Sequence, residues 1–312
     1  MNVLQSLLKE LPFSTAELLS IISTAPYRYK VYKIAKREPG AFRTIAQPTP
    51  EVKLIQRWLV KNVFSELPVH TAATAYREGL SIADHARKHS KKRFLLKMDF
   101  KNFFPSITEN DVSYHLVTML GLSGADADIV SKLVCWRDRT QSKNCLSIGA
   151  PSSPSLSNSI LYQFDLAATV VAKTNSAIYS RYADDLAFST DKKGVLISIE
   201  SEIRSVCDKL RYPKLAVNKS KTVFTSRANG RFLVGLNLTT EGGISVGRER
   251  KRRIRSLLYR ISNNSSIDCD LAMLRGELSF IWSVEPEFIM SMVRQFGVDI
   301  FRKLDLPFGM DR

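Results

Sequence analysis

The spacing of apolar residues changes along the chain, and each spacing predicts a different kind of element. Near the N-terminus, Ser14 and Glu17 form a capping-box signature ahead of apolar residues at helical spacing, so a helix is expected there. Residues 27–34 instead alternate aromatic or aliphatic with basic side chains, which is the period of a strand. This strand is either an ordinary half-exposed edge or a surface for nucleic acid. A second helix is predicted from Pro50, because proline suits the first helical turn, until Pro68.

The middle of the chain has the pattern of a sheet surrounded by helices. A buried strand is predicted at residues 94–99, where an apolar run ends in an acid and a Phe-Phe-Pro stop follows. Helices are expected after the capping signal at Thr108 and over residues 125–136 and 157–171. The other predicted strands are residues 176–182 and 185–190 as a hairpin, then 214–218, 221–226 and 231–238. This mixture predicts an α+β fold with a sheet at its centre.

The C-terminal part is predicted to be a small basic helical lobe. Residues 248–260 contain seven basic residues and one acid, arranged at helical spacing around Ile254, Leu257 and Leu258. Two further helices are expected near residues 270–283 and 286–296.

Length, composition and charge indicate the size of the protein and the kind of partner it binds. The 312 residues suggest two or three packed lobes, since a domain usually has about 100 to 200 residues. With 44% apolar and 9% aromatic residues the chain can bury a core, and its apolar runs are too short for a membrane span. The 46 Lys and Arg against 30 Asp and Glu leave a net charge of +16. Such an excess predicts a polyanionic partner, and the short apolar runs predict no membrane partner.

Cysteine and histidine usage excludes several other chemistries. The four cysteines, Cys135, Cys145, Cys207 and Cys269, form no C-x-x-C pair, and the N-terminus has no secretion signal. They are expected to be reduced and mostly buried, in a cytoplasmic protein. His85 and His89 would share a helical face, but no third ligand type lies nearby, which argues against zinc. The basic run that contains them, residues 85–93, is typical of a solvated face.

The candidate chemistry lies in three acids. Asp184 and Asp185 are adjacent at the tip of the predicted hairpin, where burial and mutual repulsion would raise their pKa values unless a cation compensates. Asp99 ends a separate apolar strand. Carboxylates on neighbouring strands of one sheet can converge and hold two Mg²⁺ ions, which activate a hydroxyl and stabilise a pyrophosphate leaving group. The predicted reaction is nucleotidyl transfer on a basic, nucleic-acid-binding surface.

Three sequence blocks also carry a family resemblance. They are FLLKMDFKNFFPSI at residues 94–107, GAPSSPSLSN at 149–158, and YADD with its flanking strands at 179–189. In this order and at these separations they resemble the reverse transcriptases, most closely those of bacterial retrons, from about residue 26 to about residue 296.

The resemblance implies an α+β right-hand polymerase, made of fingers, a palm and a helical thumb. The palm is expected to be an antiparallel sheet with helices on one face. The implied divisions are N-terminal helices and fingers at residues 1–93, a palm at 94–246 with interleaved finger and helical segments at about 108–150, and a basic helical thumb at 247–312.

Carried over to this sequence, the resemblance makes Asp99, Asp184 and Asp185 the metal-binding aspartates. Phe104 matches the aromatic gate that excludes a ribose 2′-OH by steric conflict, whereas Phe103 is the better core residue. Three residues match the loop that shapes the dNTP pocket: Gly149, Ala150 and Pro151. Many reverse transcriptases have Gln immediately before that glycine, where this chain has Ile148, so one amide contact is missing.

Other contacts to the substrates are implied in the same way. Lys221, favoured over Lys219, corresponds to a lysine near the triphosphate that can neutralise or protonate the departing pyrophosphate. Arg43 resembles a basic residue of the fingers that faces the triphosphate. Val234 and Gly235 lie in a turn that resembles the one gripping the primer end.

Two segments resemble retron markers in altered form. HARKH at residues 85–89 has His85 where the group has Asn, and LVG at 233–235 lies where many have V-T-G. RGELSFIWSVEP at 275–286 also resembles a retron thumb. Six basic residues are the predicted RNA contacts: Arg87, Lys88, Arg250, Lys251, Arg253 and Arg255.

The function implied by the resemblance is an RNA-directed DNA polymerase with two Mg²⁺ ions and dNTPs as substrates. It would bind a cognate structured non-coding RNA and copy part of it into a short, 2′-branched single-stranded msDNA. In retrons this activity belongs to anti-phage defence with a separately encoded effector protein, and this chain has no P-loop motif of its own. The alternatives are a catalytically idle RNA-binding scaffold restraining an effector, and a reverse transcriptase of another lineage.

Overall fold

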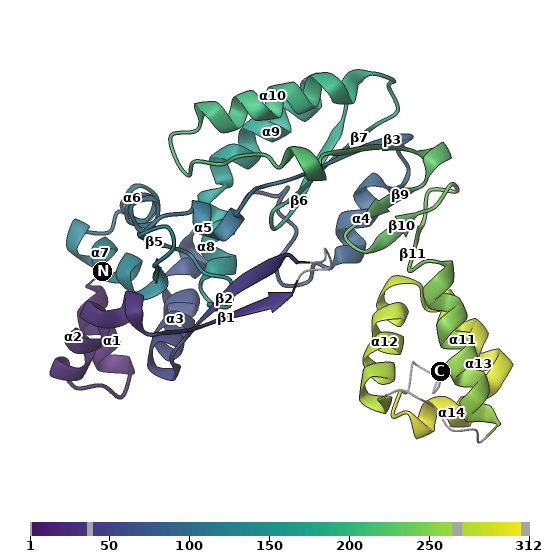
Figure 1. Ribbon diagram of the computed structural model, residues 1–312, viewed down its shortest axis with the longest axis horizontal. Helices are drawn as coiled ribbons and strands as arrows, with labels where there is room; N and C mark the ends of the chain where they lie inside the picture. The colour runs from purple at the N-terminus through teal and green to yellow at the C-terminus, as the bar shows by residue number, and fades with distance from the viewer. Residues whose placement is uncertain (1, 36–39, 264–269, 307–312) are drawn as a thin grey trace.

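The computed structural model describes residues 2–35, 40–263 and 270–306. Helices from both the N-terminal part and the middle of the sequence form one end of the molecule, a β-sheet forms its centre, and the C-terminal helices form the other end (Figure 1). The predicted α+β class is therefore confirmed.

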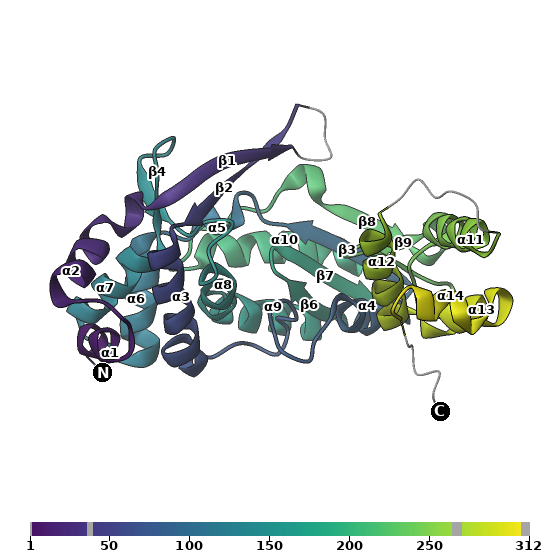
Figure 2. The same ribbon diagram turned by 90° about the horizontal axis from the view of Figure 1, so that it is seen from below.

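The N-terminal end contains α1 (Val3–Glu10), α2 (Thr15–Thr24) and α3 (Pro50–Asn62). The predicted capping box is present at the start of α2. Helix α3 ends before the predicted Pro68, and a short 3₁₀ turn, Phe64–Glu66, follows it. The predicted strand is β1 (Tyr29–Ala35), and it pairs in antiparallel register with β2 (Phe42–Pro48), which the spacing did not predict. This hairpin projects from the helical end (Figure 2).

The middle of the chain supplies the remaining helices of the body. They are α4 (Ile82–Ser90), α5 (Phe103–Ser106), α6 (Glu109–Leu120), α7 (Gly124–Val134), α8 (Ser153–Ile160), α9 (Tyr162–Thr174) and α10 (Val195–Lys209). Helix α10 was not predicted, although its buried residues Leu196, Ile199, Ile203 and Cys207 have helical spacing. A small hairpin of β4 (Trp136–Asp138) and β5 (Lys143–Cys145) follows α7.

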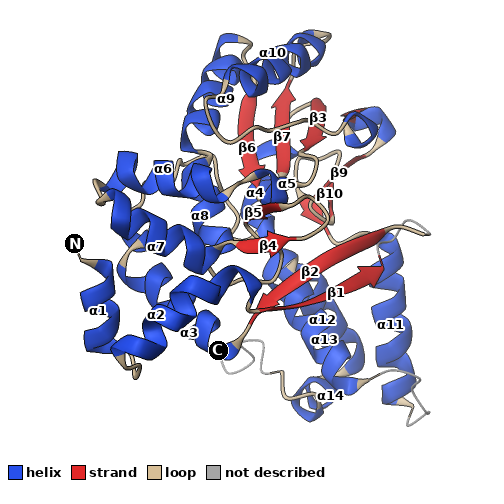
Figure 3. Ribbon diagram, turned by 60° about the vertical axis from the view of Figure 1, so that its left-hand side comes forward, coloured by secondary structure: helices blue, strands red, loops and turns tan. Residues whose placement is uncertain are grey.

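The central sheet has the antiparallel order β6-β7-β3-β8. Its strands are β6 (Ile178–Tyr182), β7 (Asp185–Thr190), β3 (Phe94–Asp99) and β8 (Val223–Ser226). The predicted strand at 214–218 is wrong: Val217 forms an isolated bridge to Phe100. Figure 3 shows β6, β7 and β3 side by side, with α9 and α10 at one edge of the view.

The sheet is covered on both faces, which corrects the expectation of helices on one face. Strand residues alternate between the faces, so on β6 Tyr179 and Arg181 are directed toward α9, where both bond Asp165. Ser180 is directed the other way and bonds histidines of α4. Helix α4 fits there because its buried face carries small alanines and polar groups that the serines can pair with.

The C-terminal end begins with a three-stranded sheet of β9 (Arg231–Leu233), β10 (Leu236–Leu238) and β11 (Ile244–Ser245). The predicted strand 231–238 is thus two strands. Helices α11 (Arg248–Ser262), α12 (Leu271–Val284), α13 (Pro286–Phe296) and α14 (Val298–Lys303) follow. Their apolar core continues into β9, β10 and α4, across the predicted division at residue 246.

Two further expectations concern the chain as a whole. Cys135, Cys145 and Cys207 are buried free thiols as predicted. Cys269 and the end of the predicted thumb, residues 307–312, lie outside the described residues. Among the described helices, none combines the length and apolar character needed to cross a membrane.

Candidate active site

The three predicted acids lie at one end of the central sheet. Asp99, the last residue of β3, is the cross-strand partner of Asp185, the first residue of β7. Asp184 lies in the two-residue turn between β6 and β7, and its carbonyl accepts a hydrogen bond of 3.3 Å from the backbone N–H of Phe100. Strand register therefore brings together two acids, Asp99 and Asp185, that are 86 positions apart in the sequence.

The electrostatics of this end favour a cation. Desolvation, then repulsion from Asp184 and Asp99, raises the pKa of Asp185 to about 6. Desolvation and the nearby Asp99 also raise the pKa of Asp184 above its usual value. Arg43 and Lys221 lie close enough to oppose that rise. Carboxylates held together in this way are more stable with additional positive charge beside them.

Lys221 already supplies one such charge. Its Nζ lies 2.9 Å from Oδ2 of Asp99, from the 3₁₀ turn Lys219–Lys221. Partial burial lowers the pKa of Lys221, but the hydrogen bond to Asp99 and the three carboxylates outweigh it and raise the pKa overall. Of the two lysines considered, Lys221 is thus the one that contacts the acids.

The donor set fits hard divalent cations, which prefer carboxylate oxygens. As the side chains stand, however, no group of three or more Asp, Glu, His or Cys residues in the described ranges is arranged so that it could hold a metal ion. The Lys221 bond engages one oxygen of Asp99. The other oxygen of Asp99 is not engaged by Lys221, and the acids would need side-chain rearrangement to hold a metal together.

A buried ion pair, which the sequence analysis missed, supports the turn that carries Asp184. Arg181 and Asp165 are both fully buried, and two guanidinium nitrogens donate to the two carboxylate oxygens at 2.8 and 2.6 Å. A third nitrogen, Nη1, donates to the carbonyl of Ala183 at 2.9 Å and to Oδ1 of Asn158 at 3.2 Å. An Arg inside an apolar strand pattern was the available signal, since such a charge needs a partner.

The two phenylalanines after β3 differ in burial, although both contact the hydrophobic core. Phe103 is buried and stacks on Phe100 with ring centroids 5.8 Å apart, whereas Phe104 is half-buried. Phe104 therefore has a surface that a substrate can contact.

The loop of Gly149, Ala150 and Pro151 lies against the β1–β2 hairpin. Ala46 of β2 donates its N–H to the carbonyl of Ile148 at 3.0 Å. Gly149 has φ +115°, and a Cβ there would lie 3.1 Å from Ile45 Cγ2 and 3.3 Å from the Ala46 carbonyl oxygen. Glycine is required here by strand β2 as well as by its backbone conformation. Arg43, on the same strand, is exposed.

Tyr76 is a second residue near the acids that sequence reasoning missed. Its side chain is half exposed, its backbone has φ 58°, and Asp184 contributes to raising its pKa after desolvation. A bulky residue in the left-handed region is uncommon and marks a constrained position.

Val234 and Gly235 form the two-residue turn between β9 and β10. Their φ values are 43° and 86°. Positive φ at both positions suits a tight hairpin, but it strains a β-branched valine. The predicted turn is therefore present.

The basic residues of α11 divide between two environments. Arg250 and Arg253 pair with Glu277, Lys251 pairs with Glu285, and Arg255 lies 6.0 Å from the ring centroid of Phe288. Arg252 and Arg260 are exposed and have no ion pair with any described acid. They line a shallow depression together with Glu249 and Leu257. The residues chosen from the sequence are thus mainly those bound within the helical lobe.

Arg87 and Lys88 lie on the exposed face of α4. Arg87 pairs with Asp84 at 3.2 Å. The predicted solvated face is present, and the histidines of the same helix are buried.

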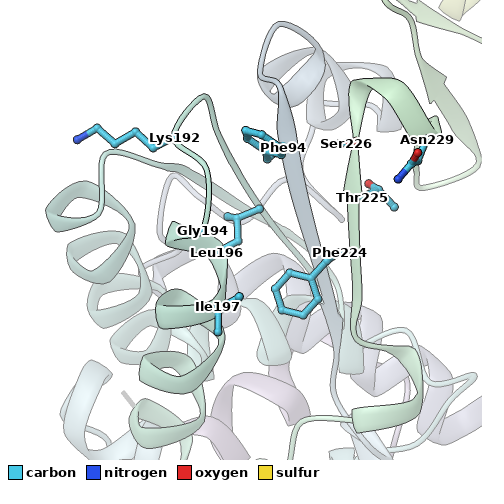
Figure 4. Close-up of a pocket in the computed structure, with 9 residues that line it drawn as sticks. All are labelled: Phe94, Lys192, Gly194, Leu196, Ile197, Phe224, Thr225, Ser226 and Asn229. Atoms are coloured by element: carbon cyan, nitrogen blue, oxygen red, sulfur yellow. The ribbon is translucent and has the colours of Figure 1, made fainter.

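A separate apolar depression of about 380 Å³ lies at the opposite end of β3 from Asp99. Figure 4 shows Phe94 and Phe224 of the sheet facing Leu196 and Ile197 of α10 across it. It contains none of the predicted site residues.

Comparison with known proteins assigns the chain to a class. The family model for reverse transcriptases, described as RNA-dependent DNA polymerases, matches residues 34–254. The chain therefore belongs to the reverse transcriptase family. It is 37% identical over 280 residues to the retron Ec83 reverse transcriptase of Escherichia coli, covering 88% of this chain and 89% of that protein. The Ec86 enzyme of the same organism is 30% identical over 311 residues, covering 97% of this chain and 93% of that protein.

These relatives define the particular group. The chain is a bacterial retron reverse transcriptase and an RNA-directed DNA polymerase. Among solved structures, telomerase from Candida albicans in complex with a fragment of telomeric RNA is similar with a TM-score of 0.51 and 12% identity, covering 93% of this chain. This chain spans 59% of that protein, and the likeness supports the right-hand polymerase fold.

Proposed function

We propose that this polymerase binds a cognate structured RNA and copies part of it into a short single-stranded DNA branched from that RNA, the msDNA of a retron. The proposal rests on the identity to retron enzymes along nearly the whole chain and on the net charge of +16. Its defence role would require a separately encoded effector protein.

The single observation that carries the catalytic part is the pairing of Asp99 with Asp185 at the end of the sheet, beside Asp184. In the proposed reaction these acids hold two Mg²⁺ ions, which supply activation of the attacking hydroxyl and neutralisation of the phosphates. Asp99 would be one of the residues that hold the metal, and Lys221, which lies beside it, would supply positive charge or a proton to the departing pyrophosphate. Arg43 provides positive charge from the fingers side.

The remaining contacts follow the positions described above. Phe104 is the proposed gate beneath the sugar, and Val234 with Gly235 is the proposed primer grip. For RNA, the exposed Arg252 and Arg260 supplement the four α11 residues proposed from the sequence, because no described acid occupies them. Arg87 and Lys88 remain candidates on α4.

Purification from the native host followed by nuclease digestion tests the product. DNA that stays covalently attached to RNA after mild digestion is expected, and RNA without DNA would contradict the proposal. Asp184→Asn tests the site, because it removes charge without changing shape. This variant should bind RNA and melt like the wild type while losing DNA synthesis, and wild-type extension in Mg²⁺ would refute the assignment.

A further inference from the structure

Two histidines of α4 are buried against the hairpin that carries the candidate aspartates. His85 and His89 are each 0% exposed, although they belong to a basic run whose other members include the exposed Arg87 and Lys88. Their rings are 5.6 Å apart. The His85 ring also lies 5.7 Å from that of Tyr182, the residue that ends β6 just before the turn.

His89 connects both strands of the hairpin with one ring. Its Nδ1 lies 2.7 Å from Oγ of Ser189 on β7, and its Nε2 lies 2.7 Å from Oγ of Ser180 on β6. His85 Nδ1 lies 3.0 Å from Ser180 Oγ and 3.0 Å from Thr74 Oγ1. Thr74 in turn donates to the carbonyl of Arg181 at 2.9 Å.

The proton positions in this series of hydrogen bonds follow from the bond between Thr74 and the Arg181 carbonyl. The single hydroxyl proton of Thr74 is used on the Arg181 carbonyl, so Thr74 must accept from His85, whose Nδ1 carries the proton. Because His85 Nδ1 carries a proton, the Ser180 hydroxyl cannot donate to it and donates to His89 Nε2 instead. The neutral His89 ring then carries its proton on Nδ1, which donates to Ser189. Burial lowers the pKa of His85 to about 3 and that of His89 well below its usual range, so both rings are neutral, as this directed chain requires.

We propose that His89 is a positioning residue, which fixes the two strands of the aspartate hairpin relative to each other and to α4 and thereby sets the geometry of polymerisation. The side chain touches neither substrate nor the aspartates, and it acts through Ser180 and Ser189. This inference rests on the proposed role of the aspartates.

The same bonds distinguish the two histidines. His89 uses both ring nitrogens, which no amide side chain can match at once. His85 is bonded through Nδ1, while its buried Nε2 has no hydrogen-bond partner within the described residues. The Nδ2 of an asparagine lies near the position of a histidine Nδ1, so Asn at position 85 should keep the bond to Thr74.

The molecule contains a matched control in His115 of α6. It too is buried, and both of its nitrogens are hydrogen-bonded, to Tyr212 Oη at 3.0 Å and to Ser159 Oγ at 2.8 Å. Those bonds join α6 to α8 and to the segment before β8, and neither of them involves a residue of the β6–β7 hairpin. His89→Ala and His115→Ala therefore remove the same side chain and the same number of bonds.

The test measures single-nucleotide incorporation on a homopolymer RNA template with a DNA primer, together with the melting temperature of each variant. His89→Ala should lower kcat about a hundredfold, as expected for a displacement near 1 Å, with KM for dNTP within about twofold. His115→Ala should lower the melting temperature similarly but keep kcat. An equal loss of kcat in both variants, or none in His89→Ala, overturns the proposal.

Smaller changes keep the test decisive if His89→Ala does not fold. Ser180→Ala and Ser189→Ala each delete one oxygen, and each should lower kcat while the protein remains folded. Wild-type kcat in both refutes the positioning role. His85→Asn should retain activity, and a loss as large as that of His89→Ala contradicts the distinction between the two histidines. An Asp184→Asn enzyme that remains active would instead refute the proposed aspartate site.

Discussion

The buried pair of Arg181 and Asp165 allows a quantitative prediction about stability. Both side chains are fully buried, and Asp165 also accepts a hydrogen bond of 2.7 Å from Tyr179 Oη. Asp165→Asn keeps the size of the side chain but leaves the guanidinium without its counter-charge. Removing one partner of a buried pair costs about 3 to 5 kcal/mol, because an uncompensated charge remains inside the protein.

That loss is large against the total stability of a folded domain, which is about 5 to 15 kcal/mol. Urea denaturation followed by circular dichroism gives the free energy of unfolding from the midpoint and the slope. The half-buried pair of Arg204 and Glu200 on α10 provides the control. Glu200→Gln should cost about 0.3 to 0.5 kcal/mol, as is usual for pairs one helical turn apart.

A second substitution separates charge from packing. Arg181→Met in the Asp165→Asn background removes the unpaired cation, so it should recover part of the lost free energy. An Asp165→Asn protein destabilised by less than about 1 kcal/mol would refute this account of the buried charge. So would a double variant less stable than the single one.

Three other predictions concern the site and the RNA surface. Phe104→Ala should raise ribonucleotide incorporation relative to dNTP in single-nucleotide assays, and unchanged discrimination would count against a steric gate. In metal-free protein Asp185 binds its proton more tightly when folded, since its pKa is raised to about 6. Its contribution to stability therefore falls as pH rises from about 4 to about 6. The melting temperature of Asp185→Asn should rise relative to that of the wild type across that range. A difference in melting temperature that does not change with pH would contradict the raised pKa of Asp185. Arg252→Gln with Arg260→Gln should reduce the slope of log affinity for RNA against log salt by about 0.7 to 0.9 per lost phosphate contact, whereas an unchanged slope would exclude these contacts.

Local pattern was sufficient where an element carries its own signal. The capping boxes at Ser14 and Thr108 predicted helices that begin where the structure has them, and the apolar run before Asp99 predicted a buried strand. The YADD hairpin was likewise predicted, because two strand-like runs flank a short acidic turn. The chemistry of the site could be proposed for the same reason, since its acids mark the ends of these strands.

Other features depended on contacts between distant segments. Residues 214–218 have a strand-like composition, yet β3 pairs with β8 and leaves Val217 an isolated bridge. Which basic residues of α11 are ion-paired depends on two acids outside that helix, Glu277 of α12 and Glu285 between α12 and α13. Spacing along one helix cannot reveal which of its cations an acid elsewhere will bind.

The sequence by itself determined the class of the protein and the acids that mark its candidate site, and its charge predicted a polyanionic partner. Only the tertiary structure decided how those acids are held. The basic run at residues 85–93 indicated a solvated face, but packing of α4 on the sheet buried two of its histidines against serines about a hundred positions away. Buried polar groups must find partners, and the fold determines which partners are within reach.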